Sequence, residues 1–379
     1  MHVGFLSPSS KVYPGIAFEF MDGLKACLKA KNADNDIRLT LESVGVAGEE
    51  KAVYVAAEKL LMTEGVDVLV AFVDERVLEI MKPLVYASGK LLIVVNPGAN
   101  YPLNWIAQEN IIHLTLLQAF LCWLSGTDAA AETKTGGTSS TFYDCGYLHA
   151  AAMMNGFVQH GGKVLFNDVN NQLYNDQYNQ TTLLTKAAVH PDNKTLLCVL
   201  DTWPAAQLYK QLPAGEPWKL FASAMMLQPP AKEAIPADAA FTVQGYQSWD
   251  AASNSDANTA FREAYASRSK KEPSFFSVLG WETALLLQHI LTAMPDSYTD
   301  GAAVTDALKT VTFDSPRGEL KLDPDTLYYT SPVCKVSIAG GEEKRTMVSP
   351  EAYAAEWTSF TSRVTSGAVS GWTNTYLCY

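Results

Sequence analysis

The sequence predicts an α/β fold of two doubly wound parallel-sheet lobes, and three observations lead to this expectation. Residues 1–100 alternate between strand and helix patterns with very little between them. The same alternation restarts after residue 141, and three consecutive helical patterns after residue 256 have no strands of their own. We therefore expect these helices to return to the first lobe, so that both lobes are discontinuous and several strands cross between them in a hinge.

Four strands are expected in the first hundred residues. Runs of β-forming apolar residues predict them at residues 2–6, 37–41, 66–73 and 91–95. Apolar residues at helical spacing predict the intervening helices, and Pro14 suits the first turn of the first helix. Ligands bind outside the carboxyl ends of strands in such parallel sheets. The first candidates for a site are therefore the loops at 7–13, 72–75 and 96–100.

The second half of the chain opens with residues 126–141, whose Ala, Thr, Gly and Ser content indicates a crossover into a second lobe. The strand expected before Tyr143 is unusually polar, so we expect this lobe to begin irregularly. Polar residues 244–256 are expected to form the return crossing. The other expected elements are helices at about 142–160, 182–189, 204–212, 257–267, 275–292 and 301–310, strands at 163–166, 196–200, 218–222 and 313–323, and a hairpin at 333–341.

Length and charge exclude several classes of function. A chain of 379 residues is long enough for two or three domains. Its formal net charge of −12 disfavours nucleic acid and anionic membranes as partners, because both need Lys and Arg to neutralise phosphate. The best candidate for a membrane span, residues 111–125, is only about fifteen residues long and contains His113 and Gln118. We therefore do not expect the chain to span a membrane.

No secretory leader precedes His2, which already belongs to the first expected strand. We therefore expect the protein to be either cytoplasmic or a mature form whose leader was replaced by Met1. Six cysteines are too few for a disulfide scaffold in a chain of this length. Cys27, Cys122 and Cys198 lie in apolar patterns and are expected to be buried thiols. Cys334 and Cys378 could pair in an oxidising compartment, which the sequence leaves open.

Catalytic and cofactor motifs are poorly represented. The six histidines show no pair at i and i+4, so no metal site is predicted. The chain has no G-x-S-x-G, no Walker loop and no G-x-G-x-x-G, and residues 136–139 lack the lysine that a phosphate loop needs. Ser9, Ser10 and Lys11 are adjacent in a loop, which is commonplace and does not indicate a Ser-Lys dyad. We expect no enzyme activity and no cofactor.

Several motifs in a fixed order carry a family resemblance. They are residues 4–10, 13–15, Gly23, 95–100, 143–147, 161–164, 280–284 and 313–318. Over nearly its whole length the chain resembles the type I periplasmic solute-binding proteins, in particular the branched-chain amino acid and amide-binding group of ABC transporters. The resemblance implies two lobes that close on a small-molecule ligand like a clamshell, with one lobe formed by residues 1–125 plus 250–315 and the other by 126–249 plus 316–379.

The resemblance also implies where the ligand is held. The first lobe is expected to bind its polar head through strand-end loops, and the second to cover it with an aromatic side chain. The implied residues and their strand-end neighbours are Ser9, Ser10, Tyr13, Phe72, Asp74, Glu75, Asn96, Gly98 and Asn100 in the first lobe, and Tyr147, Asp201, Trp203 and Met225 in the second.

One departure from the family pattern bears on the ligand. Amino-acid binders of this group usually have an acidic residue after the last of these strands, whereas residues 222–225 contain none. An unpaired buried ammonium is costly, so Asp201 or Asp74 must serve instead, or the ligand is not an amino acid.

Several of the residues that could line the cleft also have a structural alternative. Asp201 would cap the helix that begins near Pro204, and the Asp74-Glu75 pair would cap and charge the third helix. Tyr13 would pack on the first helix, and Trp105 and Trp249 would be packed in the core rather than line the cleft.

The predicted function is that of an extracytoplasmic solute-binding protein. It would capture a small polar organic molecule, an amino acid or a related compound, and deliver it to the membrane permease of an ABC transporter. The resemblance implies a periplasmic location for the mature protein. The alternative is the same fold used as a sensor, either the ligand domain of a receptor or a cytoplasmic amide-type regulator.

Overall fold

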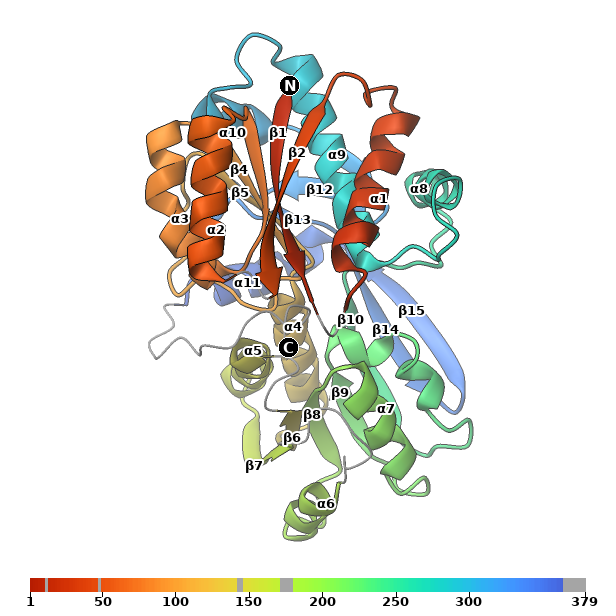
Figure 1. Ribbon diagram of the computed structural model, residues 1–379. Coiled ribbons are helices and arrows are strands. Elements are labelled where there is room, and N and C mark those ends of the chain that lie inside the picture. The colour runs from red at the N-terminus through yellow and green to blue at the C-terminus, as the bar shows by residue number, and fades with distance from the viewer. Residues whose placement is uncertain (11–12, 47–48, 142–145, 171–179, 364–379) are drawn as a thin grey trace.

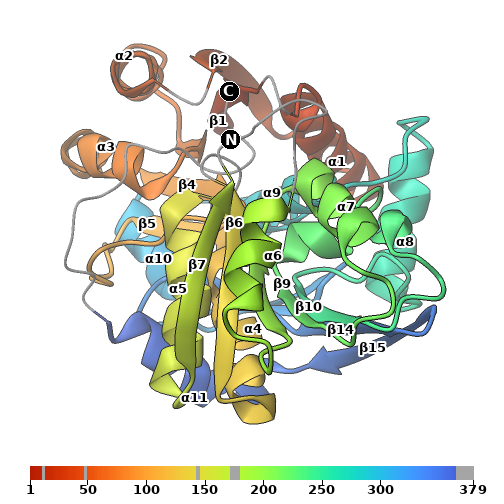
Figure 2. The same cartoon turned by 90° about the horizontal axis from the view of Figure 1, so that it is seen from below.

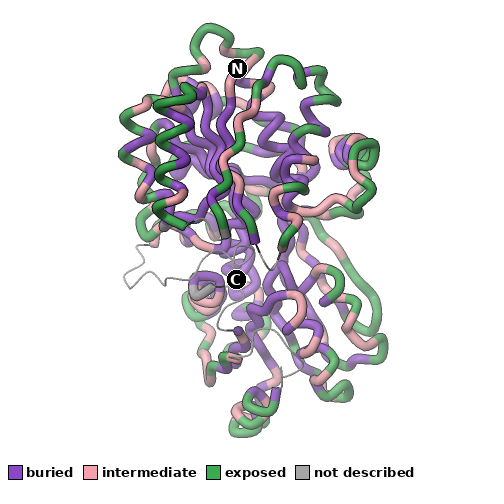
Figure 3. Tube along the Cα trace, in the orientation of Figure 1, coloured by how far each residue is buried: buried purple, intermediate pink, exposed green. Residues whose placement is uncertain are grey.

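The computed structural model describes residues 1–10, 13–46, 49–141, 146–170 and 180–363. Its two lobes lie one above the other in Figure 1, each built on a mainly parallel sheet with helices on both faces. The strands in the centre of each lobe are buried, and the exposed stretches lie mainly on the outer helices and loops (Figure 3). The predicted α/β fold of two doubly wound lobes is confirmed.

The first sheet has five parallel strands in the order β2-β1-β3-β4-β5. They are β1 (His2–Ser9), β2 (Arg38–Val46), β3 (Val68–Phe72), β4 (Leu91–Asn96) and β5 (Ile111–Thr115). One face packs on α2 (Glu50–Glu58), its π-helical extension η1 (Lys59–Thr63) and α3 (Glu75–Ser88). The other face packs on α1 (Ile16–Ala30), α9 (Phe275–Ala293) and α10 (Gly301–Leu308), with α8 (Asp256–Ala266) outside α1. The late helices therefore return to the first sheet, as predicted.

The second sheet has seven strands in the order β15-β14-β10-β9-β8-β6-β7 (Figure 2). They are β6 (Thr135–Thr141), β7 (Lys163–Asn170), β8 (Thr195–Val199), β9 (Lys219–Ala222), β10 (Thr242–Gln247), β14 (Val333–Ala339) and β15 (Glu342–Val348). The last two form the expected hairpin and pair antiparallel to β10. The helices and 3₁₀ turns of this lobe are α4 (Gln118–Glu132), α5 (Gly146–Gln159), α6 (Thr181–Ala188), α7 (Thr202–Gln211), η2 (Ala224–Leu227), η3 (Lys232–Ala234) and α11 (Pro350–Thr361).

One stretch differs from expectation. Residues 244–247, the first part of the expected return crossing, belong to β10, where the polar side chains of Gln244 and Gln247 bond to Glu132 and to the Leu227 carbonyl. The polar segment 135–141 forms β6 with a shift in register between Gly136 and Gly137, in keeping with the expected irregular start of this lobe. Its glycines have a packing reason, since a Cβ on Gly137 would lie within 2.2 Å of the Phe166 ring.

Reciprocal glycines bring helices into close contact in both lobes. A Cβ on Gly23 of α1 would lie 2.0 Å from the Ser277 carbonyl oxygen, and one on Gly280 of α9 would lie 1.9 Å from that of Phe20. In the second lobe, Gly126 of α4 and Gly156 of α5 meet the facing helix backbone in the same way. Only glycine permits these approaches, so the four positions fix how each helix pair crosses.

A buried ion pair ties α9 to a small third sheet of β11 (Thr312–Ser315), β12 (Gly318–Leu322) and β13 (Tyr329–Thr330). Arg317 donates to both carboxylate oxygens of Glu282, at 2.8 and 2.6 Å, and both side chains are fully buried. Arg317 also donates to the Thr115 carbonyl at 3.0 Å, and Ser315 donates to Glu282. The sequence motifs at 280–284 and 313–318 are thus joined by one buried network of hydrogen bonds beside the end of β5.

The chain passes between the sheets after β5, after β10 and between β13 and β14. An aromatic cluster covers this junction, where Trp357 and Phe360 of α11 pack on Trp105 from the first lobe and on Phe120 of α4. Trp123 of α4 donates to Glu356 of α11 at 2.7 Å. The helix α11 therefore packs against one side of the junction and contacts both lobes.

Cys27, Cys122 and Cys198 are buried free thiols, as predicted. Burial raises the pKa of Cys27 to about 12, and it raises the pKa of the other two further. Cys334 is also a buried free thiol, and its possible partner Cys378 lies outside the described residues. In the part of the chain that the structure describes, no helix is both long and apolar enough to cross a membrane.

Candidate functional site

A hydrogen bond joins the two lobes where loops at the carboxyl ends of their strands meet. Tyr13, in the loop between β1 and α1, donates from its hydroxyl to Oδ1 of Asp201 at 2.8 Å, and its oxygen lies 3.4 Å from the Thr202 hydroxyl. Asp201 follows β8 of the second sheet and precedes α7. The contact spans 188 residues of sequence. It places the predicted first-lobe loop directly against the predicted second-lobe residues.

The first-lobe loops are held by hydrogen bonds within their own lobe. The Ser10 hydroxyl accepts from the Tyr13 backbone N–H at 3.0 Å. Asn96 donates to the Val73 carbonyl at 2.8 Å and accepts from the Gly98 N–H at 2.7 Å, which ties the ends of β3 and β4 together. Gly98 has φ +72°, and a Cβ there would lie 2.6 Å from the Leu117 nitrogen. Hydrogen bonds and close packing within the first lobe therefore hold the ends of β3 and β4 together.

The two acidic residues before α3 have contacts within the first lobe. Asp74 caps the helix, since its carboxylate accepts from the Val77 N–H at 3.1 Å, which confirms the capping alternative for this residue. Glu75 is buried and accepts from the Tyr328 hydroxyl, and His113 lies 3.3 Å from the same oxygen. Burial by itself raises the pKa of Glu75, but His113 and Tyr328 outweigh it and hold the pKa below its ordinary value.

Three further first-lobe candidates differ in exposure. Phe72 is fully buried, with its ring 6.1 Å from those of Phe20 and Phe276, so its side chain belongs to the core. Ser9 is exposed and Asn100 is half-buried. The edge of the Tyr13 ring packs against Phe276 at 6.2 Å, so Tyr13 combines contact with the α9 helix and the bond to the other lobe.

Asp201 is the central residue on the second-lobe side. It caps α7, accepting from the Thr202 N–H at 2.6 Å and from the Thr202 hydroxyl at 3.2 Å, so the capping alternative is confirmed here too. Burial raises the pKa of Asp201, an effect that the bonds from Thr202 and Tyr13 partly offset. The electrostatic environment thus favours an added hydrogen-bond donor near this carboxylate.

The other second-lobe candidates lie around the same strand ends. Trp203 is half-buried and packs against the second-lobe core. Met225 is buried in the 3₁₀ turn after β9, where the sequence has no carboxylate. Tyr147 is the second residue of α5, and its side chain lies outside the described part of the structure. Trp249 is buried and bonded to Asn258, as its packing alternative expects.

Sequence reasoning missed two partnerships at this site. Tyr13 and Asp201 were separate candidates, and nothing in the sequence linked them. His113 and Tyr328 were not candidates, although a histidine inside the apolar β5 pattern is a signal that a buried polar partner is needed. Among the described residues, no cluster of three or more His, Cys, Asp or Glu side chains could hold a metal ion.

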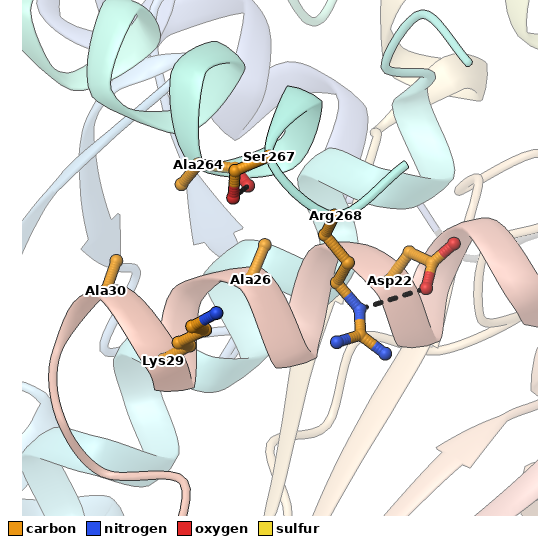
Figure 4. A pocket seen from close by; sticks show the side chains of 7 residues that line it. All are labelled: Asp22, Ala26, Lys29, Ala30, Ala264, Ser267 and Arg268. Atoms are coloured by element: carbon orange, nitrogen blue, oxygen red, sulfur yellow. Dashed lines mark hydrogen bonds and ion pairs between the residues drawn. The ribbon is translucent and has the colours of Figure 1, made fainter. Parts of the chain in front are cut away.

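A separate open hollow of about 470 Å³ lies between α1 and α8, on the outer side of the first lobe. Figure 4 shows Arg268, which follows α8, reaching to Asp22 of α1, where the two form an ion pair at 3.1 Å. The rest of the lining consists of Lys29, Ser267 and small alanines. None of the predicted site residues lines this hollow, so it is distinct from the contact between the lobes.

These features define a class: a two-lobed α/β binding protein of the type I periplasmic fold, with facing strand-end loops. The chain belongs to the periplasmic binding protein family, because a sequence model of that family matches residues 1–333. The resemblance seen in the sequence is therefore confirmed. No curated protein sequence is significantly similar to the chain.

Solved structures share the fold over almost the whole chain. A solute-binding protein of an ABC transporter from R. palustris, in complex with benzoate, is 19% identical with a TM-score of 0.71, over 93% of this chain and 98% of its own. An ABC transporter substrate-binding protein from Sphaerobacter thermophilus is 16% identical with a TM-score of 0.75, over 92% and 96%. A leucine-binding protein from Thermotoga maritima is 14% identical with a TM-score of 0.67, over 93% and 99%. At these identities the likeness shows the fold.

Proposed function

We propose that this protein is the extracytoplasmic solute-binding component of an ABC transporter and captures a small organic acid by closure of its two lobes. The observation that carries the proposal is the Tyr13–Asp201 hydrogen bond, which joins strand-end loops of the two lobes. A ligand that touches both sets of loops binds the closed state more tightly and shifts the lobe equilibrium toward it.

The proposed ligand class is a small carboxylic acid, aromatic or amino. Solute-binding proteins of the same fold were solved with benzoate, with 4-hydroxybenzoate and with isoleucine. In this chain, α3 and α7 have their first N–H groups capped by Asp74 and Asp201, whereas the N-cap residue of α1, Gly15, provides no side-chain cap. The start of α1 also carries a negative charge, since a Cβ on Gly15 would lie 2.7 Å from Oε1 of Glu19. We therefore place the ligand carboxylate at the hydroxyl and backbone groups around Ser10 and Tyr13, and not at a helix N-terminus.

The rest of the site follows from this placement. Backbone and hydroxyl groups at the ends of β1, β3 and β4 would hold the polar head, and Trp203 would cover the body of the ligand from the second lobe. No cofactor and no catalytic step are required. The proposed partner is the membrane permease, and the proposed location is the periplasm.

The test is thermal unfolding of the purified protein with a panel of aromatic acids, aliphatic acids and amino acids at millimolar concentration. A ligand at about a thousand times its dissociation constant stabilises the protein by about 4 kcal/mol, which is easily seen as a shift of the midpoint. Polyamines and neutral sugars serve as negative controls. A shift by carboxylic acids alone, with the compound recovered unchanged, is the expected result. Turnover of the compound, or silence toward every acid after unfolding and refolding to remove a carried-over ligand, would refute the proposal.

A further inference from the structure

The two oxygens of the Asp201 carboxylate have unequal surroundings. Asp201 is only 7% exposed. The Tyr13 hydroxyl, the Thr202 N–H and the Thr202 hydroxyl all donate to Oδ1. No donor among the described residues reaches Oδ2. One oxygen is therefore saturated and the other is left for a group that the described protein does not supply.

The second oxygen of this carboxylate is open to solvent, since it is not among the buried side-chain atoms that lack a hydrogen-bond partner. Burial of the residue is nevertheless the largest cause of the raised pKa of Asp201, so its charged form is less well hydrated than that of an exposed carboxylate. A donor from a bound molecule can therefore replace water at Oδ2 and stabilise the charged form.

The position of the carboxylate indicates what that partner is. Tyr13 approaches from the first lobe, so the carboxylate lies where the two lobes face each other. Its orientation is fixed, because the three donors to Oδ1 come from α7 and from the opposite lobe. A donor bound between the lobes would meet a preorganised acceptor, which needs no rearrangement to accept the bond.

We propose that Oδ2 of Asp201 accepts a hydrogen bond from the ligand, so that the protein selects small organic acids carrying a hydroxyl or ammonium group apart from their carboxylate. This inference rests on the proposed function and narrows its ligand class. It also accounts for the absence of an acidic residue after β9. Asp201, which follows the neighbouring strand β8, would accept the hydrogen bond from the ligand instead. Its carboxylate can accept from a phenolic hydroxyl as well as from an ammonium group.

The test compares ligands that differ by one donor, using calorimetric titration. The pairs are benzoate with 4-hydroxybenzoate, and 4-methylpentanoate with leucine. The variant is Asp201→Asn. Asparagine remains a good helix cap, and its carbonyl oxygen keeps the Thr202 and Tyr13 bonds, so its NH₂ group replaces Oδ2. Asp300→Asn is the matched control, since Asp300 caps α10 on the exposed surface.

In the wild type and the control, the donor-bearing member of at least one pair is expected to bind about 10-fold tighter or more, as for a hydrogen bond to a charged group. In Asp201→Asn, that preference should fall by about 10-fold or vanish, because NH₂ cannot accept the bond. Should Asp201→Asn fail to fold, Asp201→Ser supplies the same readout, since serine also caps a helix but has a single oxygen.

Three outcomes would overturn the inference, and they are distinguishable. Equal binding within each pair by the wild type would show that no donor is recognised, while the proposed function stands. A preference that survives in Asp201→Asn would place the recognition at another residue. Absence of binding by every compound, in the wild type and in Asp300→Asn, would refute the proposed ligand class itself and the inference with it.

Discussion

Replacing Tyr13 by phenylalanine tests whether the bond between the lobes controls closure. The change removes only the hydroxyl that donates to Asp201 and leaves the ring that packs on Phe276. Asp201 keeps both bonds from Thr202, so the α7 cap is retained. The perturbation therefore acts on the closed arrangement and on neither lobe alone.

The size of the effect follows from the kind of bond. A hydrogen bond to a charged partner contributes about 1.5–3 kcal/mol, which corresponds to a factor of roughly 10 to 150 in an equilibrium constant. If the free protein is mostly open, the apparent dissociation constant rises by that whole factor, because binding must pay for a rarer closed state. If the free protein is mostly closed, the same energy appears instead as opening of the ligand-free form.

The assay combines calorimetric titration with small-angle X-ray scattering of the ligand-free protein. We expect Tyr13→Phe to weaken all ligands by the same factor, to enlarge the ligand-free particle, or both. This uniform effect contrasts with Asp201→Asn, which should act only on ligands with a second donor. Unchanged affinity together with unchanged scattering would refute the reasoning, because the bond would then contribute nothing to closure.

Three further predictions concern the frame of the molecule. Glu282→Gln should lower the free energy of unfolding by about 3–5 kcal/mol in urea titrations, because it leaves the buried Arg317 without its counter-charge; a loss below 1 kcal/mol would contradict this. Gly280→Ala should cost about 1–3 kcal/mol or more, since its Cβ would clash with the α1 backbone, whereas Gly215→Ala, with open space around it, should cost far less. The folded-state pKa of Glu75 lies below its ordinary value of 4.5, so its charge stabilises the fold above pH 4.5 and this contribution is lost as the pH falls through the folded pKa. The difference in unfolding free energy between wild type and Glu75→Gln should accordingly shrink between pH 6 and pH 3, and a constant difference would show that the charge is not involved.

Local patterns predicted most of the fold because each element buries a distinct apolar face. The return of residues 256–308 to the first sheet could be predicted, since helices with apolar stripes and no strands must pack on a sheet that already exists. The error falls where polar residues bond to distant partners. Gln244 looked like a loop residue because its partner, Glu132, is 112 positions away. The small residues of 135–141 indicated an irregular strand, and the structure supplies the reason, since the Phe166 ring of the neighbouring strand leaves no room for a Cβ on Gly137.

The candidate site was predictable in outline, because parallel strands place their following loops at one edge. The caps at Asp74 and Asp201 were also readable, as each acid directly precedes a helical pattern. What the sequence could not show is which oxygen of Asp201 is occupied, or that Tyr13 supplies one of its donors from the opposite lobe. The ligand-binding roles of the thirteen candidate residues stay predictions for the experiments above.

The way the loops are held has a consequence for how binding is transmitted. Asn96 and Gly98 fix the first-lobe loops to each other, and the Thr202 bonds fix Asp201 to α7. A ligand that leaves these bonds in place would direct its binding energy to the equilibrium between the open and closed arrangements of the lobes. The hydrogen bond from Tyr13 to Asp201 already joins the two lobes. A ligand donor on Oδ2 would therefore add to the same carboxylate that Tyr13 holds, and ligand selection and closure would be coupled through a single side chain.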